Sequence, residues 1–163
     1  MVDRLRGMYG FVIWDREKKK MFGDERYFRY QTILLCTDER SFLFGSEIKS
    51  FVEHPKFDKV FNEEALGNYL SFQFVPTNET FFKGVYCLQP GHYFTYEDGK
   101  LEVTRYFEPN FTGDTDKSFD EVVDEIEKVM KESVEMHKIS DVEVGSYLSS
   151  GVDSSYMAYL GQV

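Results

Sequence analysis

The chain has 163 residues, and with 42% hydrophobic and 17% aromatic residues it can bury a core, which excludes a disordered tail. Its 19 Lys and Arg against 29 Asp and Glu give a formal net charge of -10, which argues against a nucleic-acid partner and a polybasic membrane surface. No apolar run approaches the ~20 residues of a membrane helix, and residues 1–6 do not open a signal peptide. A cytoplasmic protein with one ordinary domain is the first expectation.

The first 45 residues have the pattern of short strands joined by polar turns. Residues 8–14 are aromatic and β-branched and predict a buried strand, with Trp14 in the core. The charged residues 15–20 predict a hairpin turn. Four strands in succession predict one antiparallel sheet, with strands at residues 8–14, 21–23, 31–36 and 41–45 and a second turn at 37–40.

Two helices are predicted next. Residues 47–52 predict a short helix that stops at His54, because a residue before proline is pushed out of the helical region. Asn62 is a plausible N-cap for a second helix whose apolar face carries Leu66, Tyr69 and Leu70.

After Pro76 the pattern returns to strands. Residues 81–88 predict one strand, and residues 92–96 and 101–106 predict a hairpin closed by Asp98 and Gly99. The polar, aperiodic residues 109–117 are typical of a linker.

The sequence pattern changes after the linker. Ser118 and Glu121 match a capping box, and the helix that they open has apolar residues every three or four positions, at Val122, Ile126, Val129, Met130 and Val134. Residues 142–148 predict a strand, and residues 156–160 are compatible with a helix. This order of helix, strand, small-residue loop and helix is the opening of an α/β nucleotide-binding unit.

The cysteines and histidines do not form a site in the sequence. Cys36 and Cys87 lie in apolar segments without a CxxC pair, which favours buried, reduced thiols. The histidines are far apart, and we assign them to a turn (His54), a strand (His92) and a helix end (His137).

The loop at residues 149–155 is the segment whose composition indicates chemistry. Small hydroxyl residues and glycine let the backbone approach a polyanion, and a helix beginning near Ser154 would aim unpaired N–H groups at it. Asp153 is a candidate ligand for a Mg²⁺ ion that bridges phosphate oxygens. The loop lacks the lysine of a Walker A motif. A serine-rich loop taken alone is usually a turn, so the prediction of phosphate binding depends on the place of this loop between a strand and a helix.

Several segments in order resemble glutamine-hydrolysing asparagine synthetase. Residues 140–155 (SDVEVGSYLSSGVDSS) resemble the family's SDVPVG followed by its pyrophosphate loop SGGxDSS. Residues 5–11 (LRGMYGF) resemble LRGMFAF, and residues 46–49 (SEIK) are identical to the family's SEIK. Residues 69–93 resemble the stretch that ends the glutaminase domain and leads into the synthetase.

The resemblance implies the fold and the function. On this resemblance, residues 1–108 would belong to an α+β glutaminase domain. They would form the C-terminal half of its antiparallel sheet, which is of the N-terminal nucleophile hydrolase type. After the linker 109–117, residues 118–163 would be the beginning of an α/β domain of the ATP-pyrophosphatase type. The family transfers amide nitrogen from glutamine to aspartate, using ATP and Mg²⁺. The residues implied to hold ATP and pyrophosphate are Leu148, Ser149, Ser150, Gly151, Val152, Asp153, Ser154 and Ser155.

The departures from the family pattern limit what this chain alone is expected to do. The family's glutaminase nucleophile is an N-terminal cysteine, whereas this chain begins with Met1 and Val2, so we assign no catalytic residue. Residues 25–31 stand where the family has RDRFGIKPL. Ser150 replaces the first glycine of SGG, at a cost of ~1 kcal/mol if that position needs a positive φ. We therefore expect an internal piece of a larger enzyme that is inactive by itself.

Two alternatives remain open at this stage. The chain could be a piece of a related amidotransferase or β-lactam-synthetase-like enzyme, because the residues that select aspartate would lie beyond Val163. The alternative of another class is a non-catalytic module that binds a nucleotide or a subunit. Exposed strand edges can pair with a second copy of the chain, so a homodimer is also left open as an assembly.

Overall fold

The computed structural model describes residues 2–27, 32–37, 41–113 and 116–161. The chain divides into two compact units, Met1–Pro109 and Asn110–Val163, and the boundary falls at the start of the stretch interpreted as a linker. None of the described helices is long and apolar enough to cross a membrane.

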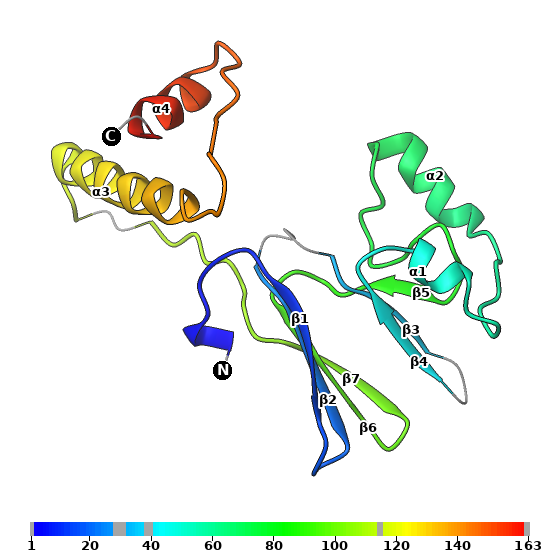
Figure 1. The fold of residues 1–163 in the computed structure, drawn as a ribbon. Helices are drawn as coiled ribbons and strands as arrows, with labels where there is room; N and C mark the ends of the chain where they lie inside the picture. Colours follow the sequence, from blue (N-terminus) through cyan, green and yellow to red (C-terminus); the bar gives the residue numbers. More distant parts are fainter. Residues whose placement is uncertain (1, 28–31, 38–40, 114–115, 162–163) are drawn as a thin grey trace. The chain divides into compact units, whose positions relative to one another are not determined.

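In the part of the chain that the structure describes, the first unit contains seven strands and two α-helices after a short 3-10 turn at Val2–Arg4 (Figure 1). In chain order these are β1 (Gly10–Asp15), β2 (Lys20–Glu25), β3 (Leu34–Thr37), β4 (Phe42–Gly45), α1 (Lys49–Val52), α2 (Glu63–Phe72), β5 (Val85–Cys87), β6 (His92–Glu97) and β7 (Lys100–Arg105). The two predicted helices and both predicted hairpins are present, although residues 38–40 of the predicted turn 37–40 and residues 28–31 of the loop 25–31 lie outside the described residues.

The strands form two antiparallel sheets, so the prediction of one sheet was wrong. One sheet has the order β1-β2-β6-β7 and the other β4-β3-β5. The reason lies in β3, where Leu34 and Leu35 point to opposite faces and are both buried. A strand that is apolar on both faces needs a layer on each side.

One apolar cluster joins the two sheets, and a second covers the outer face of the smaller sheet. The first consists of Ile33, Leu35, Leu88 and Phe94, and the second of Leu34, Phe51 and Val85. Phe51 belongs to α1, so this short helix is anchored by one ring that is 2% exposed. The first unit is thus a small α+β domain with antiparallel sheets.

Gly23 is required where it stands because Phe94 lies against it. The two residues are directly opposite each other in the β2–β6 ladder, and Phe94 is fully buried. A Cβ at position 23 would overlap three atoms of the Phe94 ring. Glycine therefore gives the ring its place at the centre of the larger sheet.

Strand β1 is less buried than predicted. It is an edge strand of its sheet in this chain, with Ile13 and Trp14 exposed at 44% and 47%. The assignment of Trp14 to the core was wrong, because an edge strand leaves one side of its residues without a neighbour.

Two further expectations need correction. Asn62 occupies the N-cap position of α2, but its side chain makes no capping hydrogen bond and donates to the carbonyl of Thr80 at 3.2 Å. The strand predicted over 81–88 is reduced to β5, because Gly84 has a φ of +78°, outside the extended region.

Two buried carboxylates lie at one end of the larger sheet. Asp24 and Glu25 are fully buried at the end of β2, and Glu25 accepts a hydrogen bond from the backbone N–H of Ile33 at 3.2 Å. Burial and the nearby charge of Asp24 raise the pKa of Tyr106 well above its ordinary value of 10.0, and they also raise the pKa of Tyr9. Both phenols therefore remain protonated beside Asp24 and are able to donate to it.

The second unit contains α3 (Phe119–His137) and α4 (Val152–Gly161), and these two helices contact each other. The predicted capping box is present: Ser118 Oγ accepts from the Glu121 N–H at 3.4 Å, and Glu121 accepts from the Ser118 N–H at 2.8 Å. The hydrogen bonds that the Ser118 N–H and the Ser118 hydroxyl donate to the Glu121 carboxylate hold the pKa of that carboxyl below its ordinary value. The strand predicted over 142–148 was wrong, since no strand forms there and the described part of this unit offers none to pair with.

The close approach of Gly23 and Phe94 predicts a strong effect of one methyl group. Gly23→Ala should lower the free energy of unfolding by about 3 kcal/mol, because the ring cannot move within a closely packed layer. Urea unfolding followed by circular dichroism measures this loss. Gly67→Ala is the matched control: nothing lies within 4 Å of a Cβ there, and the substitution in α2 should be neutral or stabilising by about 0.5–1 kcal/mol.

The raised pKa of Tyr106 predicts a loss of stability at alkaline pH. Above pH 10 the unfolded chain releases the phenol proton while the folded chain keeps it, so the folded state loses stability as the pH rises. Tyr106→Phe should flatten the decline of unfolding free energy above pH 10, whereas Tyr159→Phe, at an exposed position, should leave its slope unchanged. Equal slopes in all three proteins would contradict the assignment.

Candidate functional site

The predicted phosphate loop connects an extended segment to α4. Helix α4 begins at Val152, two residues before the predicted start at Ser154, and its first helical hydrogen bond runs from the Ser155 N–H to the Gly151 carbonyl at 3.1 Å. The first N–H groups of such a helix have no acceptor within the helix. They form the electropositive end at which anions bind.

Serine hydroxyl groups hold the loop in shape. Ser154 Oγ accepts a hydrogen bond from the Ser149 N–H at 3.2 Å, lies 3.0 Å from Ser149 Oγ, and donates to the Gly151 carbonyl at 3.1 Å. Ser155 Oγ donates to the same carbonyl at 2.8 Å. Ser154 therefore ties the start of the loop to the first turn of the helix.

Ser150 adopts a left-handed conformation, with a φ of +65°. This is the condition under which the replacement of glycine by serine carries a cost at this position. Gly151 needs no special conformation, and a Cβ there would make ordinary contacts with the Ser149 and Ser154 hydroxyls. The strain in the loop is thus confined to Ser150.

The remaining predicted residues are open to solvent. Leu148 is 67% exposed and Val152 is 85% exposed, and only Ser154 among the loop residues is half-buried. Asp153 lies in the first turn of α4. Within the described part of the chain, no group of three or more His, Cys, Asp or Glu side chains is placed to hold a metal ion, so Asp153 fits Mg²⁺ only together with phosphate oxygens.

The two cysteines form no disulfide and lie away from this loop in the sequence. Cys36 on β3 and Cys87 on β5 are half-buried and pack against the cluster that contains Leu34. Neither is placed at a chain start, where an N-terminal nucleophile would use its own amino group. The three histidines occupy the predicted turn, strand and helix end.

Two family models match separate parts of the chain. A family model described as "Glutamine amidotransferase domain" matches residues 1–107. The chain belongs to this family. A second family model, "Asparagine synthase", matches residues 125–162, which include the loop and all of α4.

Curated relatives match almost the whole chain. An asparagine synthetase [glutamine-hydrolyzing] 1 of Bacillus subtilis is 36% identical over 94% of this chain and 24% of its own length. A putative asparagine synthetase of Mycobacterium tuberculosis H37Rv is 34% identical over 98% of this chain and 26% of its own length. An amidase, chry2, of Gibberella zeae is 27% identical. The chain spans about a quarter of the length of the curated relatives that it matches.

The left-handed φ at position 150 predicts that glycine is the better residue there. Ser150→Gly should raise the protection of the Ser149–Tyr156 amides from hydrogen exchange about two- to fivefold, because relief of ~1 kcal/mol of strain is partly offset by the extra freedom of glycine when unfolded. Ser150→Ala keeps the strain and should give no increase. Equal protection in the two variants would show that the loop does not need this conformation.

Proposed function

We propose that this chain is part of a glutamine-dependent asparagine synthetase, which converts ATP, aspartate and glutamine to asparagine, glutamate, AMP and pyrophosphate. The observation that supports this most is the order of two matches in one chain, a glutamine amidotransferase domain followed by an asparagine synthase segment. The segment of the second match contains the loop whose geometry suits an anion.

The proposed domains follow the two units. Residues 1–108 would be the C-terminal half of a glutaminase sheet of the N-terminal nucleophile hydrolase type. Residues 118–163 would open a domain of the ATP-pyrophosphatase type. The acidic composition and two cysteines that form no disulfide favour the cytoplasm, and a homodimer is the proposed assembly.

The proposed role of the loop is to hold the phosphates of ATP while aspartate is adenylated. A side-chain carboxylate oxygen of aspartate attacks the α-phosphorus, the bond to the β-phosphate oxygen breaks, and pyrophosphate leaves with the electron pair. Negative charge grows on the leaving group, where the N–H groups at the start of α4 and the hydroxyls of Ser149 and Ser150 would stabilise it. Ammonia then attacks the acyl carbon and AMP leaves.

Each residue of the loop has a distinct part in this proposal. Ser154 positions the loop through its bonds to Ser149 and Gly151, and Leu148 would contact the nucleotide. Gly151 and Val152 let the backbone approach the phosphates, and Ser155 closes the first turn. Asp153 would hold Mg²⁺, an ion that neutralises charge on the phosphate oxygens.

The 163-residue chain should bind MgATP weakly through this loop. Titration with MgATP should shift the backbone amide resonances of residues 149–155 with a dissociation constant in the millimolar range, because a phosphate loop alone makes few contacts. Ser154→Ala should weaken binding at least threefold, and Ser133→Ala on α3 should not change it. Tight binding by a monomer would favour the nucleotide-binding module instead.

The same chain should not release ammonia from glutamine. Both of its thiols, at Cys36 and Cys87, are half-buried and pack in the smaller sheet, and neither residue carries a free α-amino group that could act as the base. Glutamine-dependent ammonia release above a no-protein control would contradict this; the full-length Bacillus subtilis relative serves as the positive control.

The acceptor substrate has one alternative. Relatives named amidases, chry2 and chyE, each 27% identical to this chain, favour an alternative in which a related enzyme uses another carboxylate. Assay of the full-length protein that contains this chain, with aspartate against other carboxylic acids, separates the two.

A further inference from the structure

The outer side of α2 is apolar and exposed to solvent. This helix lies at the periphery of the first unit (Figure 1), and of its residues, all of which the structure describes, only Ala65 is buried. Leu70 is 73% exposed although it is one of the large apolar residues of the helix. We define the α2 apolar surface by six exposed residues of the helix and its flanks: Phe61, Leu66, Tyr69, Leu70, Phe72 and Phe74.

Contacts at the start of α2 hold this surface in shape. The Asn62 backbone N–H donates to the Phe81 carbonyl at 2.9 Å, and the Asn62 side chain donates to the Thr80 carbonyl at 3.2 Å. The Phe81 ring lies 6.2 Å from the Phe61 ring and 5.4 Å from the Tyr69 ring, measured between centroids. The helix start and two rings of the surface are thus fixed to the segment that precedes β5.

The end of α2 extends the same surface. Gln73 adopts a left-handed conformation, with a φ of +62°, and its N–H donates to the Tyr69 carbonyl at 2.7 Å. The chain turns there, and the Phe74 ring centroid lies 6.3 Å from that of Phe72. Residues three and four apart on a helix are neighbours, so Leu66, Tyr69 and Leu70 connect the rings at the two ends. The α2 apolar surface is therefore continuous.

The size of this surface indicates that another surface covers it. Its four rings are 43–58% exposed, which leaves about 400 Å² of ring surface in water at about 200 Å² a ring. The largest apolar patch on a typical monomer is about 300–600 Å², and patches of this size mark interaction sites. Interfaces between domains of one chain bury about 600–1,500 Å², so the α2 apolar surface can supply one side of such a contact.

Charge and concentration favour a partner within the same polypeptide over a second copy. Each copy of this chain has a formal net charge of -10, so two copies repel each other. A surface in the same polypeptide meets α2 at an effective concentration on the order of 1 mM, about a thousandfold above that of second copies in a ~1 μM solution. The chain spans 24% and 26% of the length of two curated relatives, so on the proposed function most of the polypeptide is available as the partner.

We propose that an apolar surface of the synthetase domain covers the α2 apolar surface in the full-length protein. This inference rests on the proposed function, in which residues 118–163 would only open that domain and its larger part would follow. Burial of the rings and leucines supplies the driving force. The contact would hold the glutaminase domain against the synthetase domain, which the transfer of ammonia from one to the other needs.

Hydrogen exchange measures whether α2 is covered. The backbone amides of residues 66–73 should be at least tenfold more protected in the full-length protein that contains this chain than in the 163-residue chain, at every protein concentration. Protection that rises with protein concentration would assign the surface to a second copy and overturn the proposal. Equal exchange in the two proteins would show an open surface and would also overturn it.

Two charge insertions on neighbouring positions test the face of the helix. Leu70→Glu should remove most of the added protection in the full-length protein, because it would bury a carboxylate in an apolar contact. Ser71→Glu is the matched control: it adds the same charge on the polar face that Gly67 and Ser71 share, and it should keep the protection. The same protection in both variants would contradict the proposal.

A photoreactive residue identifies the covering segment. We expect p-benzoylphenylalanine in place of Phe74, a residue 58% exposed, to form cross-links to peptides that follow residue 163. Cross-links to a segment that precedes residue 1, or to a second copy, would overturn the proposal. Asparagine synthesis by the same preparation is assayed separately. A protein that makes asparagine while α2 stays open would contradict this inference alone, and a protein that makes none would contradict the proposed function alone.

Discussion

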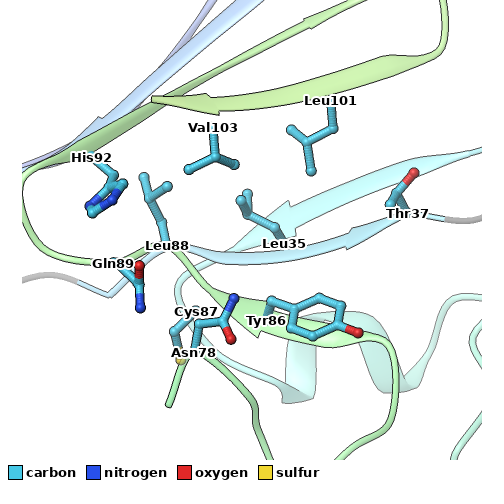
Figure 2. A pocket seen from close by; sticks show the side chains of 10 residues that line it. All are labelled: Leu35, Thr37, Asn78, Tyr86, Cys87, Leu88, Gln89, His92, Leu101 and Val103. Atoms are coloured by element: carbon cyan, nitrogen blue, oxygen red, sulfur yellow. The ribbon is translucent and has the colours of Figure 1, made fainter. Parts of the chain in front are cut away.

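The first unit depends on one ring and the glycine opposite it. Phe94 is fully buried at the centre of the larger sheet, and it reaches the smaller sheet because Gly23 has no side chain in its way. Through this ring the larger sheet contacts Ile33, Leu35 and Leu88, so one side chain links both layers. The packing of this ring therefore holds the two sheets together, and a cavity of ≈ 420 Å³ beside the cluster is lined by residues of both sheets (Figure 2).

The second unit is organised by polar groups, since most of its apolar residues are exposed. Ile126 and Val129 on α3 are 54% and 62% exposed, and α3 is instead fixed at its start by the capping box. The loop before α4 is likewise held by hydroxyl groups, with Ser154 bonded to both Ser149 and Gly151. A loop shaped by its own hydrogen bonds presents its helix N–H groups without needing a bound ligand, which is the preorganisation that phosphate binding requires.

The sequence was sufficient to predict those structural features that depend on only a few neighbouring residues. The Asp98–Gly99 hairpin was predictable because both residues adopt positive φ, and the capping box because Ser118 and Glu121 satisfy each other's backbone groups. Ser150 was also recognisable, since a serine in place of glycine indicates strain when the position is left-handed. Features that depend on distant partners were missed: Trp14 is exposed because β1 is an edge, and residues 142–148 form no strand because strands need neighbours. The cavity has no sequence signal, because its walls come from five separate segments.

In the proposed function, the loop before α4 serves an adenylating enzyme that acts on aspartate. The direct measurement uses aspartate labelled with ¹⁸O in its side-chain carboxylate, supplied with ATP and glutamine to the full-length protein that contains this chain. The account predicts that one ¹⁸O atom appears in the phosphate of AMP, because the carboxylate oxygen that attacks the α-phosphorus leaves with AMP. Formation of ADP, or of AMP without the label, would contradict it.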